Sequence, residues 1–228
     1  MSPSPRWRAS PNFDERAEPV DMLILHYTGM KTAAAALDRL CDPEARVSAH
    51  YVIEEDGAVW QLVEEERRAW HAGDSRWRGA PLVNGRSIGI ELVNPGHEFG
   101  YRPFPAAQID TLIPLCRGIL ARHAIPPRHV LGHADVAPAR KEDPGELFPW
   151  SALAKRRLAL PSPTRDLMDP FWTDAGFLLA LERFGYDVSN QQKAVIAFQR
   201  RFRPERIDGV IDGECRAKLL ALLLPRPQ

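Results

Sequence analysis

Two short apolar runs most constrain how this chain can fold. Residues 20–26 read VDMLILH between turn signals, and residues 87–93 read SIGIELV and alternate in part. Runs of this kind are typical of strands in a sheet, with the first one buried. His26 closes the first run, and the rigid end of a strand is a common place for a functional site. Hydrophobic residues make up 44% of the 228 residues, which is enough to bury a core around such a sheet.

Helical patterns accompany these strands. Residues 31–40 are rich in alanine, which favours a helix. Residues 105–123 repeat apolar side chains at helical spacing. Pro114 lies inside that pattern, where a proline can kink a helix. Strands that alternate with helices in this way predict an α/β domain.

The other segments of this part are shorter or less regular. Residues 50–53 and 58–62 flank Glu-Asp-Gly, which is a hairpin signal. Residues 130–131 could form a brief strand, and residues 132–149 are interpreted as a long irregular segment. Residues 1–19 carry four prolines and little apolar periodicity, so they are interpreted as a loop or an extended arm.

A second unit is expected beyond about residue 160. The stretch Leu160-Pro-Ser-Pro-Thr has the composition of a linker. Helical patterns follow it over residues 171–184, 190–202 and 212–224. The chain is therefore divided into a first domain, residues 1–160, and a small all-α domain of three helices, residues 166–224.

Charge and cysteine content exclude several classes of protein. The 30 basic residues balance 30 acidic ones, which argues against binding nucleic acid or anionic lipid through bulk charge. Three scattered cysteines, Cys41, Cys116 and Cys215, suit free thiols in a reducing compartment. No secretory signal is visible before Val20, and no apolar stretch reaches the roughly 20 residues of a membrane span. We therefore expect a cytoplasmic protein, or a periplasmic one if a signal has been trimmed.

One polar loop concentrates residues that can bind a metal or catalyse a reaction. Within eleven positions it holds His133, Asp135, Lys141, Glu142 and Asp143. Two imidazoles and one carboxylate can bind zinc and leave its fourth position open, so His26 and His133 are candidate ligands. A single histidine is more often a surface or buried structural residue, and spacing alone cannot pair two histidines 107 positions apart.

Five segments, in order along the chain, resemble the signature segments of one enzyme family. They read LILHYT (23–28), VSAHYVIEEDGAVWQLV (47–63), AWHAG (69–73), SIGIELVNPG (87–96) and GHADVAPARKEDPGELFPW (132–150). The family is that of the zinc-dependent N-acetylmuramoyl-L-alanine amidases of the AmpD/AmiD type, also called amidase-2, which is related to peptidoglycan recognition proteins. The resemblance covers about residues 6–158 and implies a central mixed β-sheet flanked by helices.

The resemblance also implies roles for five residues. His26, His133 and Asp143 would bind Zn²⁺. Glu91 would take a proton from the zinc-bound water and pass it to the leaving amine. Lys141 would stabilise the tetrahedral oxyanion beside the metal. Without the resemblance, Glu91 is interpreted as a solvent-facing charge on a strand and Lys141 as a solvated loop residue.

Weaker implications concern the walls of the cleft. Trp70 and His71 are expected to order the cleft wall or to touch substrate. Asn84 and Arg86 precede the second strand, where related enzymes contact the muropeptide. These four residues form the predicted substrate-binding set. His50 is expected to support the sheet or the metal, whereas the histidines outside the matched segments are interpreted as surface residues; these are His97, His123 and His129.

The end of the chain carries a second resemblance. Residues 194–223 read AVIAFQRRFRPERIDGVIDGECRAKLLALL, which resembles the peptidoglycan-binding module of three helices. The apolar residues of this segment are interpreted as its core. Its polar rim could bind sugar or stem peptide, and the module could equally be a structural appendage.

These expectations combine into one predicted function. The protein would hydrolyse the amide between N-acetylmuramic acid, in the 1,6-anhydro form, and the L-alanine of muropeptides in peptidoglycan recycling. It would act as a monomer on muropeptides, without nucleic-acid or membrane partners. Two alternatives stay open: an exported peptidoglycan amidase of broad specificity, and a non-catalytic peptidoglycan-binding protein. The complete set of implied metal and catalytic residues argues against the binding protein.

Overall fold

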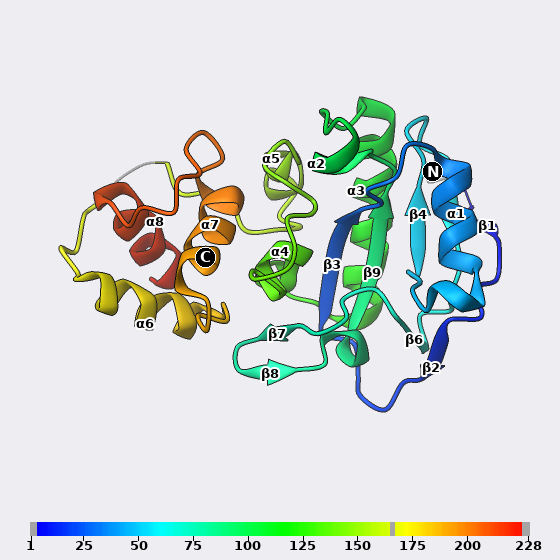
Figure 1. The fold of residues 1–228 in the computed structure, drawn as a ribbon, viewed down its shortest axis with the longest axis horizontal. Coiled ribbons are helices and arrows are strands. Elements are labelled where there is room, and N and C mark those ends of the chain that lie inside the picture. Colours follow the sequence, from blue (N-terminus) through cyan, green and yellow to red (C-terminus); the bar gives the residue numbers. More distant parts are fainter. Residues whose placement is uncertain (1–3, 165–166, 225–228) are drawn as a thin grey trace.

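The computed structural model describes residues 4–164 and 167–224 and is built around a six-stranded sheet (Figure 1). The strand order is β1-β5-β4-β9-β3-β10, and neighbours are parallel except in the antiparallel β4–β5 hairpin. The strands are β1 (Arg6–Trp7), β3 (Met22–Tyr27), β4 (Tyr51–Ile53), β5 (Val59–Gln61), β9 (Ser87–Leu92) and β10 (Val130–Gly132). The mixed sheet and its predicted strands are therefore confirmed.

The side chains of β3, which lies between β9 and β10, alternate between the two faces of this sheet. Leu25 belongs to the hydrophobic cluster that includes residues of α3 (Ala106–His123), whereas Ile24 belongs to a cluster that includes residues of the C-terminal helices. Because successive side chains point to opposite faces, His26 shares the face of Ile24. The neighbouring strand β9 runs parallel to β3 in a register that sets Glu91 opposite His26. The pleat thus brings these two side chains to one face.

Helices flank the sheet as predicted. The Thr32 hydroxyl caps α1 (Ala33–Cys41) by accepting a hydrogen bond from the Ala35 amide. The long α3 continues through Pro114 as one helix of 18 residues, so this proline does not divide it. Shorter helices follow the strands at α2 (Gly96–Phe99), α4 (His133–Val136) and α5 (Trp150–Ala154).

Three further helices follow the linker and confirm the helical C-terminal region (Figure 1). They are α6 (Asp174–Phe184), α7 (Gln191–Phe202) and α8 (Gly213–Leu223). Each begins at a polar residue whose side chain accepts a backbone hydrogen bond, namely Thr173, Asn190 and Asp212. Residue 166, predicted as the start of this unit, lies outside the described residues. None of the helices in the described ranges is long and apolar enough to cross a bilayer.

The C-terminal helices share a hydrophobic core with the first part of the chain. One cluster contains Trp77 and Ala134 together with Phe198 of α7. At its edge the Tyr186 hydroxyl donates a hydrogen bond of 2.5 Å to the buried Asp135 carboxylate. This core therefore fixes α7 against the segment that carries His133.

Short elements within the irregular segments depart from the predictions. The N-terminal arm contains β1 and β2, and the segment after residue 132 begins with the one-turn helix α4. Additional two-stranded sheets join β2 to β6 and β7 to β8. These strands are β2 (Phe13–Glu15), β6 (Arg67–Ala69), β7 (Arg76–Trp77) and β8 (Ala80–Pro81). Such elements are too short to show a period in the sequence. Pairing with residues far away in the chain defines β1 and β2, whereas β7 and β8 pair across a short turn.

Replacing Tyr186 by Phe is expected to lower the free energy of unfolding by about 1–3 kcal/mol, because the buried Asp135 carboxylate loses a donor. Urea unfolding followed by tryptophan fluorescence measures this. In an Asp135→Ala background the same substitution is expected to cost much less, since no carboxylate is left unpaired. An equal cost in both backgrounds would contradict the assignment.

Candidate active site

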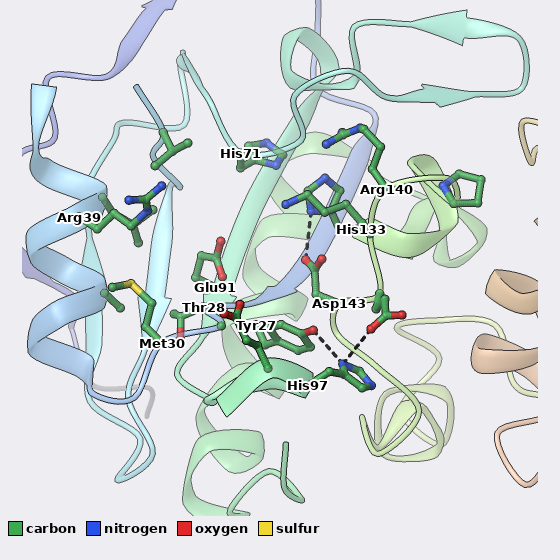
Figure 2. A pocket seen from close by; sticks show the side chains of 18 of the residues that line it. Tyr27, Thr28, Met30, Arg39, His71, Glu91, His97, His133, Arg140 and Asp143 are labelled. Atoms are coloured by element: carbon green, nitrogen blue, oxygen red, sulfur yellow. Dashed lines mark hydrogen bonds and ion pairs between the residues drawn. The ribbon is translucent and has the colours of Figure 1, made fainter. Parts of the chain in front are cut away.

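A cavity of about 490 Å³ opens at the carboxyl ends of β3, β9 and β10 (Figure 2). Its lining includes Tyr27 and Thr28 at the end of β3, Glu91 on β9 and His133 directly after β10. In open α/β sheets the crevice outside the carboxyl ends of the strands is the usual ligand site. The cavity is therefore the candidate active site.

Three side chains converge beside this cavity, and two of them, His133 and Asp143, line it. The Nδ1 atoms of His26 and His133 and the Oδ2 atom of Asp143 are each 3.0 Å from the other two. All three residues are buried, and they form a group that could hold a metal ion. The chain brings Asp143 there by a turn in which the Ala134 amide donates to the Asp143 carbonyl at 2.8 Å. The predicted ligand set thus meets in space.

The three atoms, Nδ1 of His26, Nδ1 of His133 and Oδ2 of Asp143, form a triangle. The protonation of these three residues favours the binding of a cation. The Nε2 atom of His133 lies 3.0 Å from the Ala72 carbonyl, which can only accept, so the proton of a neutral His133 is on Nε2. Its Nδ1 lone pair then faces the lone pairs of the other two vertices. Burial would raise the pKa of Asp143, but His133 and His26 hold that pKa well below its usual range. Three lone pairs directed at one point match the ligand arrangement that zinc binds. The bonds of zinc to nitrogen and oxygen are about 2.0–2.2 Å long.

His71 fixes the orientation of His26, one of the three predicted ligands. The Ser87 hydroxyl donates to the Val83 carbonyl at 2.6 Å, so its oxygen accepts from Nε2 of His71 at 3.2 Å. The Nδ1 atom of His71 therefore accepts from Nε2 of His26 at 3.0 Å, which leaves Nδ1 of His26 without a proton. Gly89 makes room for this ring, because a Cβ atom there would lie 2.5 Å from Cγ of His71.

Replacing His71 by Phe is expected to weaken zinc affinity about 10–100-fold, because the ring would remain while the acceptor for His26 is lost. Competition with a chromophoric chelator measures the dissociation constant. His129→Phe is the matched control, since His129 bonds the Asp21 carbonyl and does not line the cavity. Equal zinc affinity in both variants would show that the hydrogen bond from His26 to His71 does not support zinc binding.

Glu91 lies on the cavity wall next to the triangle (Figure 2). Its Oε2 atom is buried and has no hydrogen-bond partner among the described residues. Burial first and the Asp143 charge second raise the pKa of Glu91 to about 8, although Lys141 opposes them. A carboxyl group with such a pKa and an unoccupied oxygen can both accept and return a proton near neutral pH.

Lys141 and Trp70 also line the cavity. Lys141 stands two residues before Asp143, and its ammonium has no hydrogen-bond or ion-pair partner within residues 4–164 and 167–224. Trp70 is anchored by its indole N–H, which donates to Asp14 at 2.6 Å. Both residues therefore stand on the wall of the cavity, and their roles stay predictions.

Asn84 and Arg86 do not reach the cavity. The Asn84 side-chain oxygen accepts from the His71 and Ala72 amides at 3.2 and 2.7 Å, so Asn84 holds the turn that carries His71. Arg86 precedes β9 at the strand end opposite Glu91, where its Nε donates to Asp21 at 2.8 Å. The predicted substrate contact of these two residues is corrected to a positioning contact and a surface ion pair.

His50 and His97 have different roles, since only His97 lines the cavity. His50 accepts the Gly89 amide at 2.9 Å and supports the sheet. His97, interpreted from sequence as a surface residue, is exposed but lines the cavity. Its ring bonds the Tyr27 hydroxyl at 2.8 Å (Figure 2). The other ring nitrogen bonds the Glu146 carboxylate at 3.2 Å.

Several cavity residues were not among the candidates named from the sequence. Arg39 of α1 and Arg140 enter from opposite sides (Figure 2), and α7 contributes three more. Those from α7 are Lys193, Ile196 and Arg200. Their spacing within one helix suggests a face, but no local pattern indicates that this face meets the cavity.

Comparison with known proteins identifies the closely related enzymes. The Amidase_2 family model, described as N-acetylmuramoyl-L-alanine amidase, matches residues 16–146. N-acetylmuramoyl-L-alanine amidase AmiD of Escherichia coli is 40% identical over 231 residues, which cover 90% of this chain and 82% of AmiD.

Solved structures agree over nearly the whole chain. Escherichia coli AmiD in complex with the substrate anhydro-N-acetylmuramic acid-L-Ala-D-γ-Glu-L-Lys superposes with a TM-score of 0.80 at 38% identity, covering 92% of this chain and 91% of AmiD. AmpDh3 of Pseudomonas aeruginosa, in complex with anhydromuramic pentapeptide, gives 0.79 at 33% identity over 94% of both chains. The resemblance found in the sequence is confirmed, and the chain belongs to the Amidase_2 family of N-acetylmuramoyl-L-alanine amidases.

Proposed function

We propose that this amidase hydrolyses, with zinc, the amide between 1,6-anhydro-N-acetylmuramic acid and L-alanine in muropeptides released during peptidoglycan recycling. One observation carries the proposal: Glu91 stands in register with His26, beside three ligand atoms spaced 3.0 Å apart. The anhydro-muropeptide complexes of AmiD and AmpDh3 support this substrate class.

The residues at the cavity have separate roles in the proposed reaction. His26, His133 and Asp143 would hold zinc, which would supply a Lewis acid and lower the pKa of a water molecule to about 7. Glu91 takes the proton of the attacking water as the carbon–oxygen bond forms. Glu91 then delivers that proton to the L-alanine nitrogen as the carbon–nitrogen bond breaks, so the amine leaves neutral.

Lys141 complements this proton transfer. Its ammonium lines the same cavity and can face the carbonyl oxygen as negative charge develops there. Deep burial of the ligand residues keeps competing water away from the triangle and strengthens this electrostatic effect. Lys141 is thus assigned to oxyanion stabilisation and Glu91 to proton transfer.

The proposed setting is the cytoplasm, with a monomeric enzyme and muropeptides as its partners. Cys41, Cys116 and Cys215 are free thiols in the structure, which supports a reducing compartment. The balance of 30 basic and 30 acidic residues supports a small zwitterionic substrate over nucleic acid or a charged membrane. Cell fractionation and analytical ultracentrifugation test the compartment and the oligomeric state.

The decisive experiment compares hydrolysis rates on anhydro-muropeptides and on intact sacculi, with products identified by mass spectrometry. Faster release of the peptide from the anhydro-muropeptide is the expected result. Robust digestion of sacculi without preference for the anhydro form would favour an exported amidase of broad specificity. Binding without any release of peptide would favour a peptidoglycan-binding protein.

A further inference from the structure

One wall of the catalytic cavity comes from the C-terminal helical region. Lys193, Ile196 and Arg200 of α7 line the same cavity as Glu91 and His133. They stand at positions i, i+3 and i+7, which share one face of a helix. The face of α7 toward the cavity is therefore part of the active-site surface and not a remote binding module.

This wall is held firmly against the metal site. Ala194 and Phe198 of α7 are fully buried in the cluster that also contains Ala134, the neighbour of His133. The buried Arg201 guanidinium stacks on the Trp150 ring, 3.2 Å from its centroid. Tight packing of this kind leaves α7 little freedom to move relative to the ligands.

The two cations of this wall differ in their surroundings. The Arg200 side chain is only 12% exposed and lies between the Glu142 and Glu146 carboxylates, at 3.5 and 3.3 Å. Its charge is therefore already compensated. Lys193 is exposed, and its ammonium has no hydrogen-bond or ion-pair partner in the part of the chain that the structure describes. Lys193 thus offers an uncompensated positive charge to a ligand in the cavity.

The charge pattern of the proposed substrate shows which half can use this cation. The anhydro-muramyl half carries hydroxyl and amide groups, and no ionised group. In the peptide half, a γ-linked D-Glu leaves its α-carboxylate free, and the last residue adds a second carboxylate. A lysine ammonium is a point charge that pairs readily with a carboxylate, whereas it gains little from neutral sugar hydroxyls.

We infer that Lys193 binds a carboxylate of the stem peptide, so that α7 forms a peptide subsite of the catalytic cavity. Ile196, one turn further along the same face, gives the aliphatic part of the peptide an apolar contact. The C-terminal region then acts as a specificity determinant for the length and charge of the peptide. This inference rests on the amidase function proposed above.

Steady-state kinetics of the full chain on anhydro-N-acetylmuramyl-L-Ala-D-γ-Glu-L-Lys test the inference. Lys193→Ala is expected to raise KM about threefold to fivefold, as for an exposed ion pair, and to leave kcat unchanged. Lys193→Glu is expected to raise KM about tenfold or more, because like charges repel. Two amidated substrates, one at the D-Glu α-carboxylate and one at the C-terminal carboxylate, identify the group that is bound. Wild-type KM should rise for one of them, and Lys193→Ala should be insensitive to that amidation.

Lys155→Glu is the matched control, because it changes the net charge equally on an exposed residue that does not line the cavity. Its KM should stay at the wild-type value, and thermal unfolding checks that all variants are folded. A KM for Lys193→Glu no higher than for Lys155→Glu, or equal sensitivity of wild type and Lys193→Ala to both amidations, would overturn the inference. If wild type hydrolyses none of these substrates, the proposed function itself fails.

Discussion

Asp143→Ala is expected to remove zinc from the protein and to lower the hydrolysis rate by about a thousandfold or more. The carboxylate is the anionic vertex of the triangle, and its Oδ2 atom lies 3.0 Å from both histidine nitrogens. Two neutral imidazoles alone make a weaker site than the three-ligand set of zinc hydrolases. The metal contributes several kcal/mol of transition-state stabilisation, and each 1.36 kcal/mol is about tenfold in rate.

Metal analysis by mass spectrometry after dialysis measures this effect, together with the rate on the anhydro-muropeptide. The wild type should hold about one zinc per chain, in line with the one three-ligand set among the described residues. Glu142→Ala is the matched control, because this neighbouring carboxylate is exposed and contacts Arg200 instead of the triangle. Full zinc content in Asp143→Ala, or full activity of metal-free wild type, would disprove the assigned centre.

The strands that carry His26 and Glu91 could be predicted, because their apolar runs are visible in the sequence. The place of Glu91 at the site came from the family resemblance, since the strand pattern alone suggested a solvent-facing charge. The approach of His26 to His133 could not be derived this way, since it depends on two parallel strands that meet after 107 residues. Only the family resemblance paired these two histidines before the structure did.

The contacts around the site were the part that sequence reasoning missed. Asn84 and Arg86 lie close to Glu91 in the chain, yet they stand before the strand while Glu91 stands near its end, so a buried strand separates them from the cavity. Lys193 lies 50 residues beyond Asp143 and still enters the cavity, because a core shared by both parts of the chain packs α7 there. Proximity in sequence was therefore a poor guide to proximity in the site.

Glu91→Gln is expected to keep zinc and to lower kcat about 100-fold to 10,000-fold, the usual range for loss of a positioned acid–base group. The amide has nearly the shape of the carboxyl group but cannot take up the proton of the attacking water. Zinc content and kcat measured on the same preparation separate the two roles. Retention of most of the activity would assign proton transfer to another group.

The same substitution is expected to stabilise the metal-free protein, increasingly as pH rises. With a folded pKa of about 8 against an ordinary value of 4.5, Glu91 keeps a proton in the folded state that the unfolded chain has released. The folded state binds more protons, so wild-type stability falls as pH rises from about 4.5 to about 8. Glutamine does not ionise and escapes this loss.

We expect the Glu91→Gln protein to gain about 2 kcal/mol over wild type at pH 8.5, less than the full linkage value because the side chain borders the cavity. At pH 4 the two proteins should differ little. Urea unfolding of chelator-treated protein at both pH values measures the gain, and zinc should reduce it, since a bound cation favours the ionised carboxylate. A gain that did not depend on pH would mean that the shape of the Glu91 side chain, and not its ionisation, lowers the free energy of unfolding. The Glu91 carboxyl group thus stays protonated in the metal-free protein and ionises when a cation binds. A group with this behaviour can act as a proton carrier beside the cation.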